Sequence, residues 1–227
     1  NSAEVKRKHE KYIEGVIAGD MIVRSLGMTF SAENAAEGAS NGILFQPCGF
    51  DHVWVEWMGE PGEGAPVNQF PFNEQPEDAK EVPDPSNPDR MVIRLDNGNR
   101  LVETRYHYGN ILDGNEVIPC VIPMAGTNHT VSRQWTATMK RFKMPNRDQL
   151  APSFFRMYEI VTVFVSKGAQ SWFKYKITDR GQIGDQAILQ LGFDMMKSVA
   201  QKEVSAEVQA DAKVVNQDVV DSDDVPI

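Results

Sequence analysis

Cysteine is scarce in this chain, which has only Cys48 and Cys120 among 227 residues. Two cysteines exclude the disulfide-dense scaffolds of small secreted domains, because those scaffolds need several bridges. Neither residue belongs to a pair with metal-ligand spacing, and both have apolar or small neighbours. We therefore interpret them as buried free thiols of a protein that works in a reducing cytoplasm.

Long apolar runs are also missing. A membrane-spanning helix needs about 18 or more consecutive apolar residues. The longest candidate, residues 158–165, has only the length of a strand and contains Glu159. We expect no membrane partner.

Enzyme motifs are missing as well. The four histidines (His9, His52, His107 and His129) are scattered and have no spacing that builds a zinc site. The sequence contains no Gly-x-x-x-x-Gly-Lys phosphate loop. We therefore predict a protein without enzymatic activity, metal ion or cofactor.

Charge is abundant but segregated along the chain. The formal net charge is −9, yet residues 123–180 contain ten Lys and Arg against three acids. Residues 60–89 contain eight acids and one lysine, and residues 203–227 contain seven acids and one lysine. This asymmetry predicts an anionic partner for the basic block and an interaction tail at the end of the chain.

Short strand-like runs dominate the pattern, and turn signals separate them. Asp96-Asn97-Gly98-Asn99 is a strong hairpin signal, because Asn-Gly accepts the positive φ values of a type I′ turn. One helix lies between consecutive strands and another follows the last. This order favours a mainly β fold, an OB-like Greek-key barrel with an inserted helix and a C-terminal helix. The expected strands are 43–46, 53–58, 91–95, 100–108, 117–122, 157–165 and 171–178, and the expected helices are 129–143 and 183–201.

The composition divides the chain into segments. Residues 1–42 form an N-terminal arm in which 5–18 fit a short amphipathic helix. Residues 43–201 form the OB-like nucleic-acid-binding domain. Within it, residues 59–89 are an acidic, proline-rich insertion, which we interpret as a long surface loop or a partly disordered insertion. Residues 202–227 lack a core pattern and are expected to form a flexible acidic tail.

The expected strand 171–178 carries the clearest binding pattern. Side chains alternate across a strand, so Trp172, Lys174 and Lys176 share one face while Tyr175 and Ile177 share the other. An indole beside two ammonium groups suits single-stranded nucleic acid, because bases stack on aromatic rings and lysines neutralise phosphates. The alternative is a solvated face on which the tryptophan covers a core edge.

Other members of the basic block extend this candidate site. The helix 129–143 has its basic residues mostly off its apolar stripe, which fits either a phosphate-tracking face or an ordinary solvated face. On the strand 100–108, Tyr106 is a candidate for stacking a base or for core packing. Trp54 is a further candidate platform. The candidate nucleic-acid-binding residues are Trp172, Lys174, Lys176, Arg133, Trp135, Lys140, Arg141, Lys143, Arg147, Arg156 and Tyr106.

The chain ends with Asp221-Ser222-Asp223-Asp224-Val225-Pro226-Ile227. This run resembles the C-terminal tip of bacterial single-stranded DNA-binding proteins, in which aspartates precede an aliphatic residue, a proline and a terminal hydrophobe. It departs from that pattern at Ile227, where the family usually has phenylalanine. The resemblance implies docking of replication or recombination proteins through a basic-rimmed pocket. The implied docking residues are Asp221, Asp223, Asp224, Val225, Pro226 and Ile227.

The body of the chain looks more like divergent proteins that tailed phages encode in their replication modules. The combined hypothesis is a phage-type single-stranded DNA-binding protein that acts in DNA replication or recombination in the host cytoplasm. This hypothesis is compatible with a homo-oligomer. Two alternatives stay open. One is a phage structural or assembly protein whose proline-rich arm reaches a neighbouring subunit. The other is a nucleic-acid-processing enzyme without a recognisable motif. The sequence does not separate DNA from RNA as the ligand.

Overall fold

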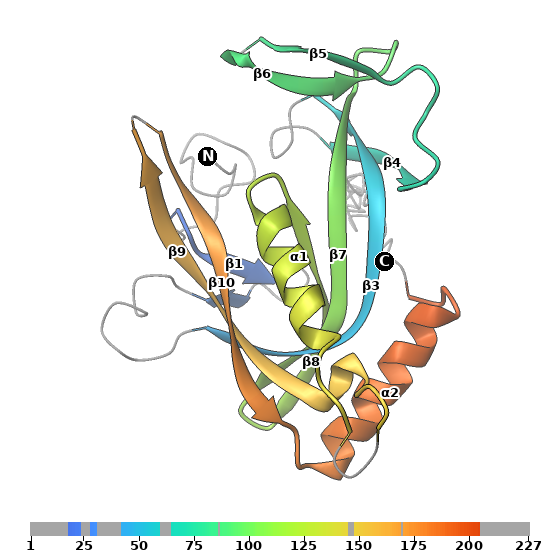
Figure 1. Cartoon of the computed structure of the whole chain (residues 1–227), viewed down its shortest axis with the longest axis vertical. Coiled ribbons are helices and arrows are strands. Elements are labelled where there is room, and N and C mark those ends of the chain that lie inside the picture. Colours follow the sequence, from blue (N-terminus) through green and yellow to red (C-terminus); the bar gives the residue numbers. More distant parts are fainter. Residues whose placement is uncertain are drawn as a thin grey trace, which may run out of the picture.

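The structure, a computed structural model, describes residues 18–23, 28–30, 42–59, 65–85, 87–144, 148–168 and 170–204. These residues form mainly β-strands together with two α-helices (Figure 1). The strands are β1 (Met21–Val23), β2 (Met28–Phe30), β3 (Ile43–Met58), β4 (Ala65–Pro71), β5 (Lys80–Asp84), β6 (Asn87–Arg94), β7 (Arg100–Asp113), β8 (Glu116–Ala125), β9 (Arg156–Lys167) and β10 (Gln170–Gln182), and the helices are α1 (Asn128–Met139), the short 3₁₀ helix η3 (Ser153–Phe155) and α2 (Gln186–Ala200).

The main sheet is antiparallel and is centred on β3. This strand pairs with β7 along most of its length, with β9 at its beginning and with β4 at its end. β7 also pairs with β8, and β9 pairs with β10. Among the described strands β8 and β10 do not pair, so the sheet is open, and α1 contacts both of them (Figure 1). The predicted mainly β class is confirmed, and this open sheet is compatible with an OB-like fold.

The two strands expected at 43–46 and 53–58 are one continuous strand, β3. Its register against β7 shifts between Pro47 and Gly49. Pro47 has no backbone N–H to donate, and such a residue is tolerated in a strand at a bulge. Gly49 lies against α2, because a Cβ built on it would be 2.6 Å from Val199 Cγ1. The sequence break that separated the two expected strands is therefore a bulge.

The interpretation of residues 59–89 as a loop is wrong for the part that the structure describes. This segment contains β4, β5 and the beginning of β6. Among the strands that the structure describes, β4 pairs only with β3, and β5 pairs only with β6. Pro66 and Pro83 therefore lie in edge strands, where one side of the backbone needs no ladder partner and proline is accepted.

The hairpin expected at residues 96–99 is present, but its turn is not type I′. Gly98 N–H donates to Leu95 O, and Leu95 N–H donates to Asn99 O. Gly98 has a φ of +84°, whereas Asn97 does not have a positive φ. This pattern is a type I turn followed by glycine in the left-handed region, the usual three-residue hairpin loop.

Both expected helices are present, with shorter bounds. α1 ends at Met139, so Phe142, which lies within the expected helix 129–143, falls beyond it, with the Arg156 guanidinium 3.7 Å from its ring centroid. α2 begins after Asp185, whose carboxylate accepts hydrogen bonds from the N–H groups of Ala187 and Ile188. This N-cap explains why the helix starts there rather than at residue 183.

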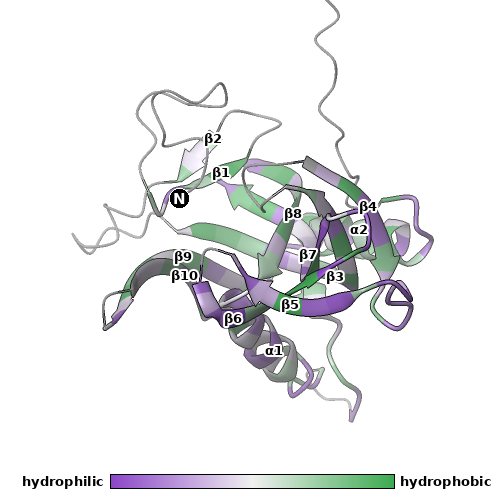
Figure 2. Cartoon of the chain, turned by 90° about the horizontal axis from the view of Figure 1, so that it is seen from above, coloured by the Kyte–Doolittle hydropathy of each residue, from purple (hydrophilic) through white to green (hydrophobic). Residues whose placement is uncertain are grey.

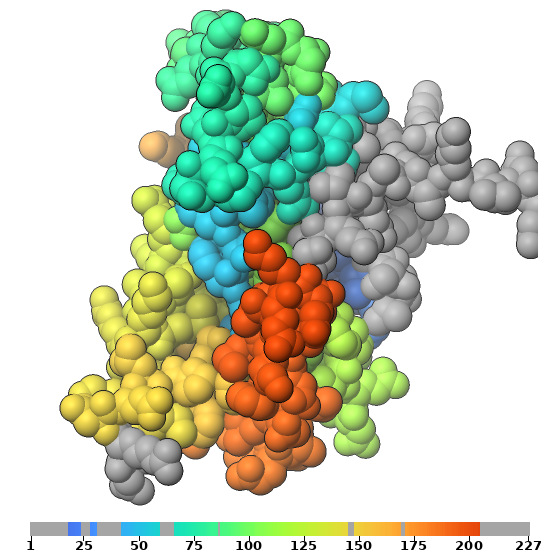
Figure 3. All heavy atoms as spheres, turned by 90° about the vertical axis from the view of Figure 1, so that its right-hand side faces the viewer, coloured from blue at the N-terminus to red at the C-terminus, as the bar shows by residue number. Residues whose placement is uncertain are grey.

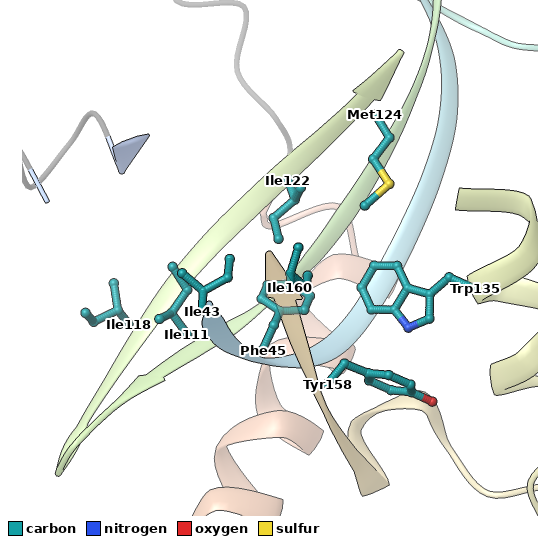
Figure 4. Close-up of a cluster of buried hydrophobic side chains, with 9 residues drawn as sticks. All are labelled: Ile43, Phe45, Ile111, Ile118, Ile122, Met124, Trp135, Tyr158 and Ile160. Atoms are coloured by element: carbon teal, nitrogen blue, oxygen red, sulfur yellow. The ribbon is translucent and has the colours of Figure 1, made fainter. Parts of the chain in front are cut away.

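The hydrophobic core lies on the face of the sheet that α1 covers. Trp135 of α1 meets Phe45 of β3 and Tyr158 of β9 there (Figure 4). Hydrophobic colouring recurs along the strands of the main sheet (Figure 2). The remaining buried members of this cluster are Ile43, Ile111, Ile118, Ile122, Met124 and Ile160.

The second helix covers the opposite face of the sheet. α2 lies across the lower part of β3 when the molecule is seen from that side (Figure 3). Gly192 of α2 faces the buried Gln46 side chain, whose amide donates to the carbonyls of Phe154 and Ile188. α1 and α2 therefore lie on opposite faces of the main sheet.

Candidate nucleic-acid interface

The basic residues of α1 and β10 lie on neighbouring elements. The N–H of Tyr175 in β10 donates to Asn128 Oδ1 at the start of α1, at 2.9 Å. Arg133 is exposed on α1, and Lys140 and Arg141 are exposed directly after it. The strand and the helix that were expected to bind nucleic acid are thus brought together.

The acids of this region are all engaged by neighbouring cations. Lys143 pairs with Asp148, Arg156 Nη2 lies 2.7 Å from Asp179 Oδ2, and Arg180 pairs with Glu159. Two predicted binding residues, Lys143 and Arg156, are therefore held by carboxylates of the chain itself. Six cations of residues 123–180 have no ion pair among the described residues: Arg133, Lys140, Arg141, Lys167, Lys174 and Lys176.

A cleft of about 570 Å³ lies between α1 and β10. It brings together three of the predicted residues, because Trp135, Lys174 and Lys176 all line it. Tyr158 and Val131 also contribute to its wall. Its walls are formed by residues of α1, β9 and β10.

The predicted alternation along β10 agrees with the packing. Tyr175 and Ile177 pack against the core, and burial raises the pKa of the Tyr175 phenol. Trp172, Lys174 and Lys176 therefore belong to the other face of the strand. Trp172 is half-buried, so part of its surface is accessible, and its indole N–H has no hydrogen-bond partner among the described residues.

Three other aromatic candidates are less accessible than expected. Trp135 is only 4% exposed and stacks on His107 with ring centroids 4.5 Å apart, so no base can reach its ring face. Trp54 is buried beside Leu95 and donates from Nε1 to Phe72 O. Tyr106 is half-buried, and burial raises its pKa to about 12. Stacking on Trp135 or Trp54 is therefore ruled out in this conformation.

The structure shows a row of rings that the sequence analysis missed. Phe72 stacks on His52 with ring centroids 3.6 Å apart, and the ring centroids of Phe50 and His107 are 5.2 Å apart. Phe50 and Phe72 are 37% and 41% exposed, and the Arg105 guanidinium lies 5.6 Å from the Phe50 ring. Phe50 and His52 are two residues apart on one strand, a spacing that signals a shared face. Phe72 gave no signal, because its segment was interpreted as a loop.

A polar cluster connects this row to the beginning of α1. His52 Nε2 lies 2.7 Å from Glu103 Oε1, and His129 Nδ1 lies 3.4 Å from the same oxygen. His129 Nε2 also lies 2.8 Å from the backbone oxygen of Glu103. These contacts fix the N-terminal turn of α1 on β7. Within the described ranges, no three His, Cys, Asp or Glu residues are grouped so that they could hold a metal ion.

Some predicted residues lie outside the described residues. They are Arg147 and the six tail residues Asp221, Asp223, Asp224, Val225, Pro226 and Ile227. The helix expected at residues 5–18 also lies almost entirely outside them. Both helices that the structure does describe are too short or too polar to cross a membrane.

These features describe a β-rich protein with a cation-lined cleft beside its inserted helix. The model of the Pam3 phage gp34-like protein family matches residues 1–205. The chain therefore belongs to this family and is a phage protein, which confirms that part of the sequence-based hypothesis. No curated protein and no solved structure matches the chain.

Proposed function

We propose that this phage protein binds single-stranded DNA during DNA replication or recombination. The observation that carries the proposal is the charge balance of α1, β9 and β10. All three acids of residues 123–180 are engaged in ion pairs, and six cations have no such partner among the described residues. Such cations attract a polyanion, because each neutralised phosphate releases condensed counterions.

Accessible rings beside these cations favour an unpaired strand over a duplex. Trp172 shares a strand face with Lys174 and Lys176, and Phe50 lies near Arg105. A base that is not in a duplex can stack on such rings, at about 1–3 kcal/mol per base, with little sequence preference. Cations that contact the phosphate backbone and rings on which bases stack are together the features of a surface that binds a single strand.

The direct test is a tryptophan fluorescence titration with oligo-dT. We expect oligo-dT to quench the tryptophan fluorescence of the wild-type protein. The double variant Lys174→Glu/Lys176→Glu should bind oligo-dT at least tenfold more weakly, because charge reversal replaces attraction of phosphates by repulsion. The matched control is Lys197→Glu/Lys202→Glu, which changes the charge equally on and after α2, a helix that packs mainly on β3, β7 and η3.

The outcomes separate the competing functions. Equal affinity for both double variants would move the binding surface away from β10. Absence of any binding by the wild-type protein would contradict the proposal and favour a structural or assembly role. Loss of the oligonucleotide that depends on a divalent metal would indicate a nuclease. Parallel titrations with oligo-U report on the choice between DNA and RNA.

We further propose that the acidic tail recruits a replication or recombination protein. The tail has a net negative charge opposite to that of the cation-rich surface, so it also competes with DNA at high effective concentration. Deletion of residues 218–227 is expected to tighten binding of oligo-dT at low salt and to abolish capture of the partner protein. Unchanged affinity together with unchanged capture would refute the role of the tail.

The assembly alternative receives no support from the described part of the proline-rich segment. That alternative requires an arm that extends to a neighbouring subunit. Instead, β4 pairs with β3, and β6 pairs with β5 and β7 of the same chain. Part of the backbone N–H and C=O groups that an arm would offer to another subunit therefore already form hydrogen bonds within this chain.

A further inference from the structure

We infer that the cleft between α1 and β10 accepts one unpaired nucleobase of a bound strand, whose adjoining phosphate lies on Lys174 and Lys176. This inference rests on the proposed function and adds a defined base-binding position to it. The position differs from ring stacking on an open surface, because the base would enter between two elements of the fold.

The size and walls of the cleft suit a nucleotide. Its volume of about 570 Å³ lies within the range of about 300–1,000 Å³ that is typical of small-ligand sites. Val131 of α1 and Ile177 of β10 provide apolar surface on opposite sides. Apolar walls facing each other favour the flat faces of an aromatic ring, and a base is such a ring.

Two buried polar atoms lie near this cleft, and Arg156 interacts with one of them, the Tyr158 hydroxyl. Trp135 and Tyr158 both line it and are only 4% and 2% exposed. In the part of the chain that the structure describes, neither Trp135 Nε1 nor Tyr158 Oη forms a hydrogen bond of normal geometry. The two side chains lie next to each other, with the indole nitrogen on the side toward Tyr158 (Figure 4). Because buried polar groups are normally hydrogen-bonded, the Trp135 N–H is suited to an acceptor atom on the edge of a base.

The charge of the cleft favours an anionic ligand. Lys174 and Lys176 line it, and neither has an ion pair within the described ranges. Asp179 also lines it, but Arg156 holds this carboxylate through Nε and Nη2. The engaged acid does not neutralise the two lysines, so a phosphate can bind at the same place as the ring.

The first test follows the indole N–H signal of Trp135 in a ¹H–¹⁵N NMR spectrum, assigned with the variant Trp135→Phe. We expect this signal to move saturably with thymidine 5′-monophosphate at millimolar concentrations and not with inorganic phosphate. An unmoved signal overturns the inference. Equal movement with inorganic phosphate overturns the base-binding part of it.

The second test fills the cleft without changing its charge. Thr138 lines the cleft, whereas the neighbouring Ala137 does not line it and is exposed. We expect Thr138→Phe to weaken oligo-dT binding about tenfold, the size of one lost base contact, and Ala137→Phe to leave it unchanged. Equal affinity of both variants overturns the inference while the proposed function stands. If the wild-type protein does not bind oligo-dT, the proposed function fails, and the monophosphate titration decides the inference alone.

Discussion

At the scale of single residues, His107 shows how burial fixes a protonation state. It lies on the core face of β7, stacks on Trp135, and its Nε2 is 2.7 Å from Ser132 Oγ. Burial, together with the smaller effect of the positive charge of Arg105, lowers the pKa of His107 to about 3. Between about pH 3 and pH 6.5 the imidazole is therefore neutral in the folded protein but charged in the unfolded chain.

This shift predicts a loss of stability in mild acid. Below pH 6.5 the unfolded chain binds a proton that folded His107 refuses, so the free energy of unfolding falls as the pH falls from 6.5 toward about 3. Between about pH 7 and 5 the loss from this one group is about 2 kcal/mol. Urea unfolding of the wild type and of His107→Gln measures it. The variant should lack this part of the pH dependence, and an identical pH dependence in the two proteins would contradict the assigned burial.

The sequence predicted some residue roles and not others, for a physical reason. Strand alternation is local, so the shared face of Trp172, Lys174 and Lys176 was predictable from β10 alone. The burial of Cys48 was also predictable from its neighbours, and burial raises the pKa of its thiol to about 12. The pairing of Arg156 with Asp179 was not, because it joins two strands through a register that only the fold defines.

At the scale of elements, the docking of α2 depends on one buried side chain. Gln46 of β3 donates to Phe154 O and Ile188 O at 3.0 Å, and it accepts from Asn110 Nδ2 at 2.9 Å. Gly192 of α2 approaches it so closely that a Cβ there would lie 2.3 Å from Gln46 Nε2. Because this amide is held by hydrogen bonds, it cannot move aside without losing them.

Gly192→Ala is therefore expected to destabilise the protein, although alanine is the better helix former. Overpacking a well-filled site typically costs about 1–3 kcal/mol, which exceeds the gain of about 1 kcal/mol from helix propensity. The matched control is Gly184→Ala, since a Cβ at Gly184 would meet nothing within 4 Å. Thermal unfolding of both variants tests this packing. A Gly192→Ala protein as stable as the Gly184→Ala protein would show that α2 does not approach Gln46 in this way.

Elements were predicted well where the signal was local. The β9–β10 hairpin, the turn at Gly98 and both helices were expected from periodicity and turn residues, and all are present. β4 and β5 were missed, because their prolines argue against strands unless the strands lie at an edge. Whether a strand lies at an edge depends on the assembled sheet, so it cannot be predicted from a short stretch of sequence.

At the scale of the whole molecule, opposite charges lie in different parts of the fold. The acids of residues 60–89 that the structure describes lie mostly on and around β4, β5 and β6, at the top of Figure 1. The unpaired cations belong to α1 and to the β9–β10 hairpin beside it. A protein with a net charge of −9 can therefore present a locally positive surface to DNA.

The salt dependence of oligo-dT binding tests this claim most directly. For a single strand, the slope of log K against log salt concentration is about −0.7 per neutralised phosphate, so six cations predict a slope that approaches about −4. The Lys174→Glu/Lys176→Glu protein should give a clearly shallower slope, and the Lys197→Glu/Lys202→Glu protein should match the wild type. A wild-type slope near zero, or no binding at low salt, would contradict the account.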